Sequence, residues 1–284
     1  RAHKTLDEWK KDIDKFDAKQ FDLDQYGISI GVNSDILYWK DMLDYCYNFN
    51  KLNAPRPRVV VIDVAHAGNR LVYEFVQEIV WYRTDLNKNM RFDIVVGNIA
   101  TAEAAARYKE LDIDGIKVGV GPGAACTTRI KTGCGVPQLS AIMEVARMLK
   151  HSDIKLIADG GVKEPGDVVK ALAAGADCCM LGKMLAYAKE SPGWQKLGIA
   201  HHPQWEKVYQ GEASFREDRS PEGIKQFLKR DNEPETVKTI LERYQDYIQS
   251  GMSYQNAKTI EHLQENATFI EVSANTLIEN NPRY

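Results

Sequence analysis

The feature of this sequence that most constrains its fold is a regular alternation of two hydrophobic patterns. Short apolar runs rich in β-branched residues recur along the chain, and amphipathic helical patterns lie between them. The strand-like runs are 28–32, 59–64, 93–99, 115–121, 155–161 and 178–182, and the helical patterns are 34–49, 69–84, 102–110, 137–150 and 166–174. This alternation predicts βαβ units of the α/β class, arranged as an open doubly wound sheet or as a closed barrel.

A closed (β/α)₈ barrel has more strands than this sequence shows. Residues 1–26 have the pattern of a polar helix and linker, so a TIM barrel built from this chain would lack its first two strands. The 284 residues suit a single catalytic domain over 1–284, with barrel strands over 27–182. The stretch 183–233 is too polar and irregular for a core element, and we expect it to form an active-site flap. A helix over 234–250 and a terminal segment over 257–272 belong to the C-terminal part, 234–284.

Charge and cysteine content exclude several classes of protein. The chain has 37 basic and 40 acidic side chains and a net charge of −3, which argues against nucleic-acid binding driven by bulk charge. It has no apolar stretch of membrane-spanning length and no secretion signal, so we expect a soluble cytoplasmic protein. The five cysteines show no C-x-x-C spacing, which indicates neither a disulfide framework nor a zinc site. Cys178 and Cys179 lie inside a predicted strand and are expected in the core.

The most informative stretch is KVGVGPGAACTTRIKTGCGVPQ, residues 117–138. Its glycines allow the backbone to curl closely around a ligand or an ion. Cys126 lies on this loop with Arg129 nearby, a setting that activates a thiol as a nucleophile. A buried, purely structural cysteine is the competing interpretation. The position of the loop after the carboxyl end of a strand favours the nucleophile.

Two later strand ends carry residues suited to a sugar phosphate. Asp159 is followed by Gly160 and Gly161, which combines a carboxylate for sugar hydroxyls with backbone amides for a phosphate. Gly182 and Lys183 end the next strand and add a cation to a second phosphate-binding turn. One Gly-Gly pair alone would indicate only a tight turn, but two successive strand ends of this kind predict a phosphate site.

Several long motifs carry a family resemblance. The segments GPGAACTTR, ADGG at 158–161, PGDVVKALAAGAD at 165–177, MLGKMLA at 180–186 and the late SGMSYQNAKTIEHLQENATFIEV resemble the IMP dehydrogenase and GMP reductase family. With weaker upstream matches, the resemblance covers roughly residues 27–284. It implies a TIM barrel that binds a purine nucleoside monophosphate. It also implies that Cys126 attacks purine C2 and that a nicotinamide cofactor exchanges hydride with this carbon.

The resemblance also assigns roles to individual residues. The substrate would be bound by Asp159, Gly160, Gly161, Gly182, Lys183, Tyr209, Gly211 and Glu212. The cofactor, NADPH or alternatively NAD, would lie against Asp63, Asn98 and Gly119. The backbone carbonyls of Gly121, Gly123 and Cys126 match a loop that binds a monovalent cation such as K⁺. The family also suggests a homotetramer in which residues near Glu279 reach a neighbour's cation loop.

The two activities of the family differ in how the covalent intermediate at C2 is resolved. IMP dehydrogenase activates water with an Arg-Tyr pair on a long flap, whereas GMP reductase expels ammonia with a threonine and a glutamate. Here the candidate flap, 209–223, is short and contains no Arg-Tyr dipeptide. Thr128 and Glu222 stand at the positions that match the reductase pair. The sequence therefore favours NADPH-dependent conversion of GMP, or a close analogue, to IMP and ammonia.

Other segments keep two alternatives open. The stretches ATAEAA, VVKALAAGAD and AKTIEHLQENATFIEV look more like the dehydrogenase, which makes NAD-dependent oxidation of IMP to XMP the alternative. Ala124 stands where the family usually has a phosphate-binding serine, Lys183 where a small residue is usual, and Glu212 where an apolar residue is expected. Lys183 could compensate for Ala124 by supplying charge to the phosphate. These departures also allow a non-catalytic nucleotide-binding or assembly subunit.

Overall fold

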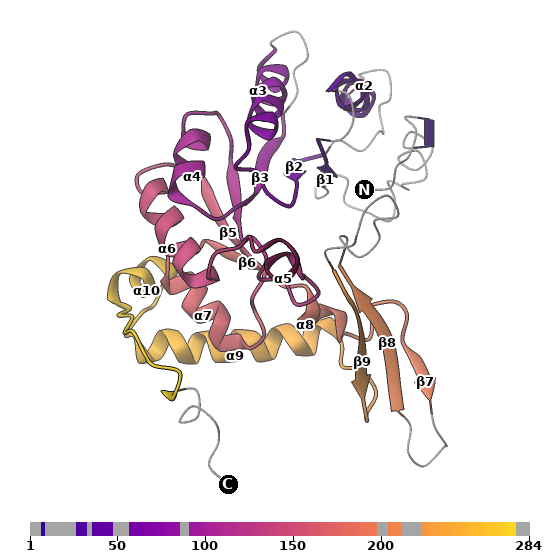
Figure 1. Cartoon of the computed structure of the whole chain (residues 1–284). Coiled ribbons are helices and arrows are strands. Elements are labelled where there is room, and N and C mark those ends of the chain that lie inside the picture. The colour runs from indigo at the N-terminus through magenta and orange to yellow at the C-terminus, as the bar shows by residue number, and fades with distance from the viewer. Residues whose placement is uncertain are drawn as a thin grey trace.

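A parallel six-stranded sheet forms the centre of the computed structural model, which describes residues 7–8, 27–32, 36–47, 57–85, 91–197, 204–211 and 223–276 (Figure 1). Its strands are β1 (Gly27–Ile30), β2 (Val59–Asp63), β3 (Asp93–Ile99), β4 (Gly115–Val118), β5 (Lys155–Asp159) and β6 (Cys178–Met180). Each strand pairs in parallel with the next one in the sequence. A doubly wound sheet needs a reversal in strand order, and this sheet has none. The predicted α/β class is confirmed, and the strand order is that of a TIM barrel.

Helices connect these strands and cover the outer side of the sheet (Figure 1). They are α2 (Ile36–Tyr47), α3 (Arg70–Thr84), α4 (Ala102–Lys109), α5 (Thr128–Thr132), α6 (Gln138–Leu149) and α7 (Pro165–Ala173). Three further helices, α8 (Lys183–Ala186), α9 (Val237–Tyr254) and α10 (Ile260–Asn266), follow the last strand of this sheet. The side chains of Asn69 and Thr101 cap α3 and α4 by accepting the N–H groups of Val72 and Ala104. The short α5 was not predicted because five residues are too few to show a helical period. Among the described helices, none is both long and apolar enough to cross a membrane.

The core has two parts. Residues of β1–β5 pack against α2, α3, α4 and α6, and every residue of β4 is buried. A second cluster joins Val168 and Leu172 of α7 to Ile240 and Tyr244 of α9 and to Leu263 of α10. The C-terminal helices are therefore anchored on the outside of the sheet through α7. The domain limits expected from the sequence remain predictions.

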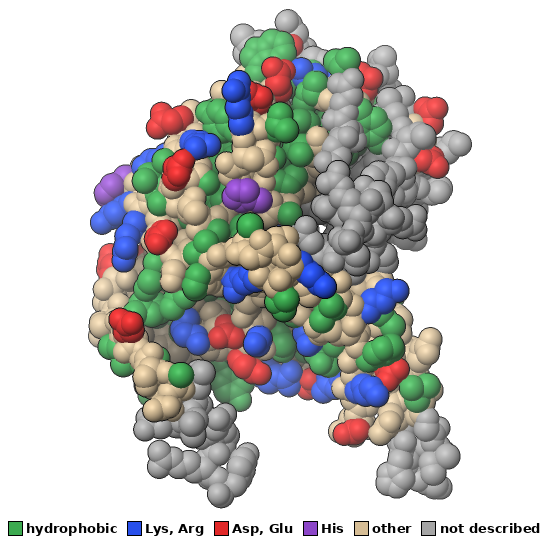
Figure 2. Space-filling model, in the orientation of Figure 1, with side chains coloured by type: hydrophobic (Ala, Val, Ile, Leu, Met, Phe, Trp, Pro, Cys, Tyr) green, Lys and Arg blue, Asp and Glu red, His purple; other side chains and the backbone are tan. Residues whose placement is uncertain are grey.

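The stretch after β6 contains an antiparallel sheet rather than the irregular flap that the sequence predicted. Its strands are β7 (Gln195–Leu197), β8 (Gln204–Gln210) and β9 (Lys225–Arg230), in the order β7-β8-β9. Lys207 and its partner Leu228 are buried on one face, whereas Val208 and its partner Phe227 are exposed on the other. Figure 2 shows hydrophobic and charged side chains intermixed over this sheet. A buried lysine and an exposed phenylalanine reverse the usual alternation, which is why the strands were missed.

The strand β6 also corrects one expectation about the core. It lies at the end of the described sheet, and the side chains of Cys178 and Met180 are exposed. The prediction that Cys178 lies in the core is therefore wrong, because only one neighbouring strand covers this edge. Cys179 is half-buried, and burial together with the neighbouring Cys178 raises the pKa of its thiol to about 12. Cys179 therefore stays protonated at neutral pH.

The buried strands predict a large stability cost for truncation of a central side chain. Ile116 in β4 is fully buried, whereas Ile130 in α5 is 83% exposed. We expect Ile116→Ala to lower the free energy of unfolding by about 3 kcal/mol, through lost transfer energy and the cavity left behind. Ile130→Ala serves as the control and should stay within about 0.5 kcal/mol. Urea denaturation followed by circular dichroism measures both changes, and equal effects would contradict this description of the core.

Candidate active site

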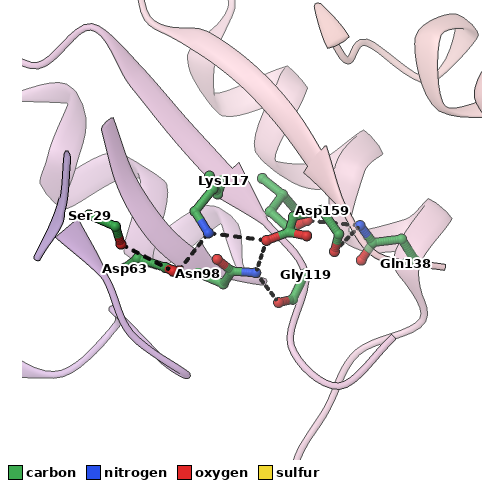
Figure 3. Close-up of polar contacts among 8 residues, drawn as sticks. Ser29, Asp63, Asn98, Lys117, Gly119, Gln138 and Asp159 are labelled. Atoms are coloured by element: carbon green, nitrogen blue, oxygen red, sulfur yellow. Dashed lines mark hydrogen bonds and ion pairs between the residues drawn. The ribbon is translucent and has the colours of Figure 1, made fainter. Parts of the chain in front are cut away.

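A buried lysine lies at the centre of the polar site formed by the parallel strands (Figure 3). The side chain of Lys117, from β4, is only 4% exposed. Its Nζ atom lies 2.6 Å from Oδ1 of Asp63, at the end of β2, and 3.1 Å from Oδ2 of Asp159, at the end of β5. A buried ammonium is costly unless it is paired, and here it bridges two carboxylates from different strands. Lys117 therefore holds these two carboxylates at fixed positions.

Asn98 extends this network from β3. Its Nδ2 atom donates to the carbonyl of Gly119 at 2.8 Å and to Oδ2 of Asp159 at 3.0 Å. Its Oδ1 atom is buried and has no hydrogen-bond partner among the described residues. A buried acceptor without a partner is costly, and a ligand that offers an N–H group would satisfy it. The three strand-end residues Asp63, Asn98 and Asp159 are thus joined in one network (Figure 3).

Gln138, the first residue of α6, contacts the backbone of the same site. Its Nε2 atom donates to the carbonyl of Val118 at 2.8 Å and to that of Asp159 at 3.3 Å (Figure 3). Between these strand ends lies Gly119, where a Cβ atom would come within 2.0 Å of the Asp159 carbonyl oxygen. Only glycine is compatible with that approach. The ends of β4 and β5 are therefore locked together by close backbone packing and by one amide side chain.

The loop after β4 presents the candidate nucleophile. The thiol of Cys126 donates to the hydroxyl of Thr128 at 3.2 Å, and the Cys126 N–H group donates to the carbonyl of Gly123 at 3.0 Å. The hydroxyl oxygen of Thr127 is buried without a hydrogen-bond partner among the described residues. The half-buried thiol thus lies within hydrogen-bond distance of a side chain that can exchange a proton.

Arg129 does not pair with this thiol in the structure. Its guanidinium donates to the carbonyl of Val120 at 3.4 Å and also to the carbonyl of Val136. Its side chain crosses directly over Gly121 and Gly135, where an added Cβ atom would collide with it. Arg129 thus braces the two sides of the loop, and the sequence-based expectation that it activates the cysteine is corrected.

The residues on either side of segment 212–222 contact the cysteine loop. Gly223 forms a β-bridge with Cys126, and the N–H group of Ile224 donates to the carbonyl of Ala125 at 2.9 Å. On the other side, a Cβ atom on Gly211 would lie 3.6 Å from Cβ of Ala125. Two of the predicted site residues, Glu212 and Glu222, lie outside the described residues. Their immediate neighbours nevertheless border the cysteine loop.

The predicted phosphate-binding glycines lie near this loop. Gly160 and Gly161 both have positive φ angles, of 92° and 84°, and Gly160 packs against Pro122 and Gly123. A Cβ atom on Gly182 would lie 3.3 Å from the hydroxyl oxygen of Tyr209, whose pKa is raised by burial. These close approaches bring Tyr209 of β8 to the turn after β6.

A cavity of about 160 Å³ lies behind Gly160 and Gly161, between α6 and α7. Sites for ligands of nucleotide size are usually at least about 300 Å³. This cavity is therefore too small for a nucleotide.

Three residues of this site were missed by sequence reasoning. A lysine inside an otherwise apolar strand is a detectable signal, because lysine is almost never fully buried without a partner, and it would have identified Lys117. Gln138 and Gln226 have no comparable signal, since glutamine is common on polar surfaces. Their roles depend on contacts between distant segments, such as the bond from Gln226 to the carbonyl of Ala124.

Comparisons with known proteins agree with the geometry. A family model described as IMP dehydrogenase / GMP reductase domain matches residues 41–283. The inosine-5'-monophosphate dehydrogenase of Thermoplasma acidophilum is 41% identical over 234 residues, which cover 78% of this chain and 46% of that protein. The GMP reductase of Leishmania donovani is 38% identical over 235 residues, with the same two coverages of 78% and 46%.

A solved structure is also similar. It is a cysteine-to-alanine variant of GMP reductase from Trypanosoma brucei in complex with guanosine 5'-monophosphate. Its TM-score is 0.74 at 34% sequence identity, and the match covers 91% of this chain and 52% of that one. The chain thus spans about half the length of the curated relatives it matches.

The Lys117 bridge predicts a loss of stability when the ammonium is removed. Lys117→Met leaves Asp63 and Asp159 facing each other without their shared cation, so we expect the free energy of unfolding to fall by about 3 kcal/mol. Adding Asp63→Asn should recover part of this loss, because one of the two charges is gone. The control Lys155→Met removes an exposed ion pair to Asp177 and should cost less than about 1 kcal/mol. Equal losses for both lysines in urea denaturation would argue against a structural role for the bridge.

Proposed function

Because the chain belongs to the IMP dehydrogenase / GMP reductase family, we propose that it is a purine nucleotide oxidoreductase that converts GMP to IMP and ammonia with NADPH. The observation that carries this proposal is the bond from the Cys126 thiol to the Thr128 hydroxyl, on a loop bridged by Gly223. Thr128 thereby stands next to the nucleophile, and the glutamate expected to work with it, Glu222, directly precedes Gly223.

In the proposed reaction, the sulfur of Cys126 attacks C2 of the purine and forms a C–S bond. The bond from C2 to the exocyclic amino group breaks, and the departing amine takes up a proton through the Thr128 hydroxyl, with Glu222 as the proton reservoir. When bound, NADPH supplies a hydride to C2. The C–S bond then breaks, which releases IMP and restores the thiolate. Atoms and charge balance when GMP, NADPH and two protons yield IMP, NADP⁺ and ammonium.

The residues at the strand ends fit a nicotinamide. The buried Oδ1 atom of Asn98 lacks a partner among the described residues and could accept from a carboxamide N–H group. Lys117 pairs with Asp63, and the carbonyl of Gly119 accepts from the Nδ2 atom of Asn98, so both residues belong to the same network. Asp159 lies on the other side of Lys117 and is suited to accept from ribose hydroxyls. We assign Asp63, Asn98 and Gly119 to the cofactor and Asp159, Gly160 and Gly161 to the substrate.

The alternative is NAD-dependent oxidation of IMP. It is supported by the names of similar curated proteins, since relatives from Thermoplasma acidophilum and Aquifex aeolicus are named inosine-5'-monophosphate dehydrogenase, at 41% and 39% identity. Hydrolysis of the covalent intermediate needs a group that activates water, and the sequence between 209 and 223 has no Arg-Tyr pair for this purpose. We therefore place the reductase first.

Two further proposals come from the family resemblance. Carbonyls of Gly121, Gly123 and Cys126 would bind a monovalent cation such as K⁺. The Gly123 carbonyl already accepts the Cys126 N–H group, and a carbonyl oxygen has a second lone pair that could serve such an ion. A cytoplasmic homotetramer would be the working assembly.

Turnover tests the proposed reaction directly. We expect GMP and NADPH to give loss of absorbance at 340 nm, and we expect Cys126→Ala to reduce this rate at least about 1,000-fold, because the covalent route is lost. Thr128→Val should lower kcat by roughly 100-fold through loss of proton transfer, with little change in KM.

The control is Cys134→Ala, because Cys134 is exposed and its hydrogen bonds are to Thr132, two residues away at the end of α5. Reduction of NAD⁺ with IMP, in place of NADPH oxidation with GMP, would select the dehydrogenase. Absence of turnover under both conditions, with nucleotide binding retained, would indicate a non-catalytic nucleotide-binding subunit.

A further inference from the structure

The cavity between α6 and α7 lies where the two parts of the core meet. Its volume is about 160 Å³, and its apolar wall consists of Leu139, Ile142, Ala158, Val162 and Ala171. Ile142 and Ala158 belong to the first core cluster, whereas Val162 packs against the second. Apolar cavities of about 150 Å³ in proteins bind molecules of the size of benzene. The volume therefore suits a ligand with a single aromatic ring.

One polar side chain of the cavity wall has an unused acceptor. Gln138 lines the cavity, and its Oε1 atom is buried without a hydrogen-bond partner among the residues that the structure describes. Its Nε2 atom donates to the carbonyls of Val118 and Asp159, so the amide cannot turn toward another donor without losing these bonds (Figure 3). A buried acceptor without a partner is costly. A ligand that brings an N–H or O–H donor would remove this cost.

The ionised side chains of the wall neutralise each other. The Nζ atom of Lys170 lies 3.2 Å from Oδ1 of Asp167, whose Oδ2 atom accepts the N–H groups of Lys163 and Glu164. The side chain of Lys170 is 60% exposed, so this ion pair lies where the cavity meets the surface. Burying a further charge among apolar side chains is costly unless that charge is paired. The cavity therefore favours a neutral ligand.

Two glycines connect the cavity to the cysteine loop. Gly160 and Gly161 line the cavity, and both have positive φ angles. Gly160 also packs against the loop, because a Cβ atom on it would lie 2.9 Å from Cγ of Pro122 and 3.1 Å from the nitrogen of Gly123. Gly123 precedes Cys126 by three residues. A ligand in the cavity would thus contact the turn on which the cysteine loop rests.

We infer that this cavity is a binding site for a compact neutral aromatic molecule with one N–H or O–H donor, and that its occupant restrains the cysteine loop through Gly160 and Gly161. The donor would bond to Oε1 of Gln138, and the ring would contact the apolar wall. The ligand binds the arrangement in which the glycine turn is packed against the loop, so it favours that arrangement over more open ones. This inference goes beyond the proposed function and does not depend on it.

Phenol and toluene are matched probes of this site, because they have the same shape and differ in one O–H donor. We expect phenol to bind the full chain with a dissociation constant of about 1 mM or tighter, as measured by saturation-transfer NMR titration. Phenol is the better hydrated of the two, so toluene would bind more tightly in a cavity without an available acceptor. We expect phenol to bind roughly 3- to 10-fold more tightly than toluene, because it bonds to Gln138.

A cavity-filling substitution locates the bound ligand. Ala171 lines the cavity and is buried, so Ala171→Leu should occupy the space and weaken phenol binding at least about 10-fold. The matched control is Ala106→Leu in α4, because Ala106 is half-buried and does not line the cavity. It should leave the affinity within about twofold. Circular dichroism establishes that both variants are folded.

Three results would overturn the site. One is a lack of phenol binding by the unsubstituted chain up to about 10 mM. Another is tighter binding of toluene than of phenol, which would exclude the bond to Gln138 without any substitution of the protein. The third is equal phenol affinity in folded Ala171→Leu and Ala106→Leu.

Alkylation of Cys126 by iodoacetamide tests the restraint on the cysteine loop. Mass spectrometry follows the tryptic peptide 118–129, which contains Cys126, with peptide 132–147, which contains Cys134, as internal reference. We expect phenol at about five times its dissociation constant to slow alkylation of Cys126 at least about twofold relative to Cys134. Ala171→Leu should abolish this effect. An unchanged ratio in the unsubstituted chain, or equal slowing in Ala171→Leu, would remove the restraint from the inference.

These measurements use no nucleotide, cofactor or turnover. A chain that binds phenol next to Ala171 but does not oxidise NADPH with GMP would retain this inference and lose the proposed function. A chain that reduces GMP, but binds phenol no better than toluene, would retain the function and lose the inference.

Discussion

The site depends on one buried positive charge. Lys117 lies in a strand whose other residues are all buried, and its ammonium pairs with the carboxylates of Asp63 and Asp159. Because those carboxylates come from strands on either side of the central pair, the cost of burying the lysine constrains the carboxyl ends of β2, β4 and β5 together. Asn98 and Gln138 then add neutral hydrogen bonds to the same network. The same contacts therefore form the polar site and hold the strand ends of the sheet together.

This arrangement explains why the parallel sheet was predictable from the sequence. Strands buried on both faces must be apolar along their length, so their pattern is visible without any tertiary information. Their carboxyl ends lie on one side of the sheet, so polar residues that follow them, such as Asp63 and Asp159, could be expected to meet. Lys117 was overlooked because one charged residue does not disturb an otherwise apolar run.

The features that were missed depend on contacts between distant segments. The three-stranded sheet after β6 buries Lys207 against Ser191 and Trp194 and leaves Phe227 exposed, so its sequence lacks the alternation typical of a half-buried strand. The partners of Arg129 are carbonyl groups, which leave no trace in a side-chain pattern. Gln226 makes its bond to Ala124 across more than 100 positions of the chain. Local pattern alone could not have identified these roles.

Gly211 and Gly223 both lie at the cysteine loop, which affects how readily the sequence between them can change. The two ends of segment 212–222 are already brought together at one place, so the entropy of closing that loop depends only weakly on its length. Doubling a flexible loop costs only about 0.6 kcal/mol, which is small beside the stability of a folded domain. Insertions, deletions and new side chains could therefore accumulate between these anchors while the barrel stays intact. Differences in the residues between these anchors would then require little change in the strands and the loop that hold Cys126.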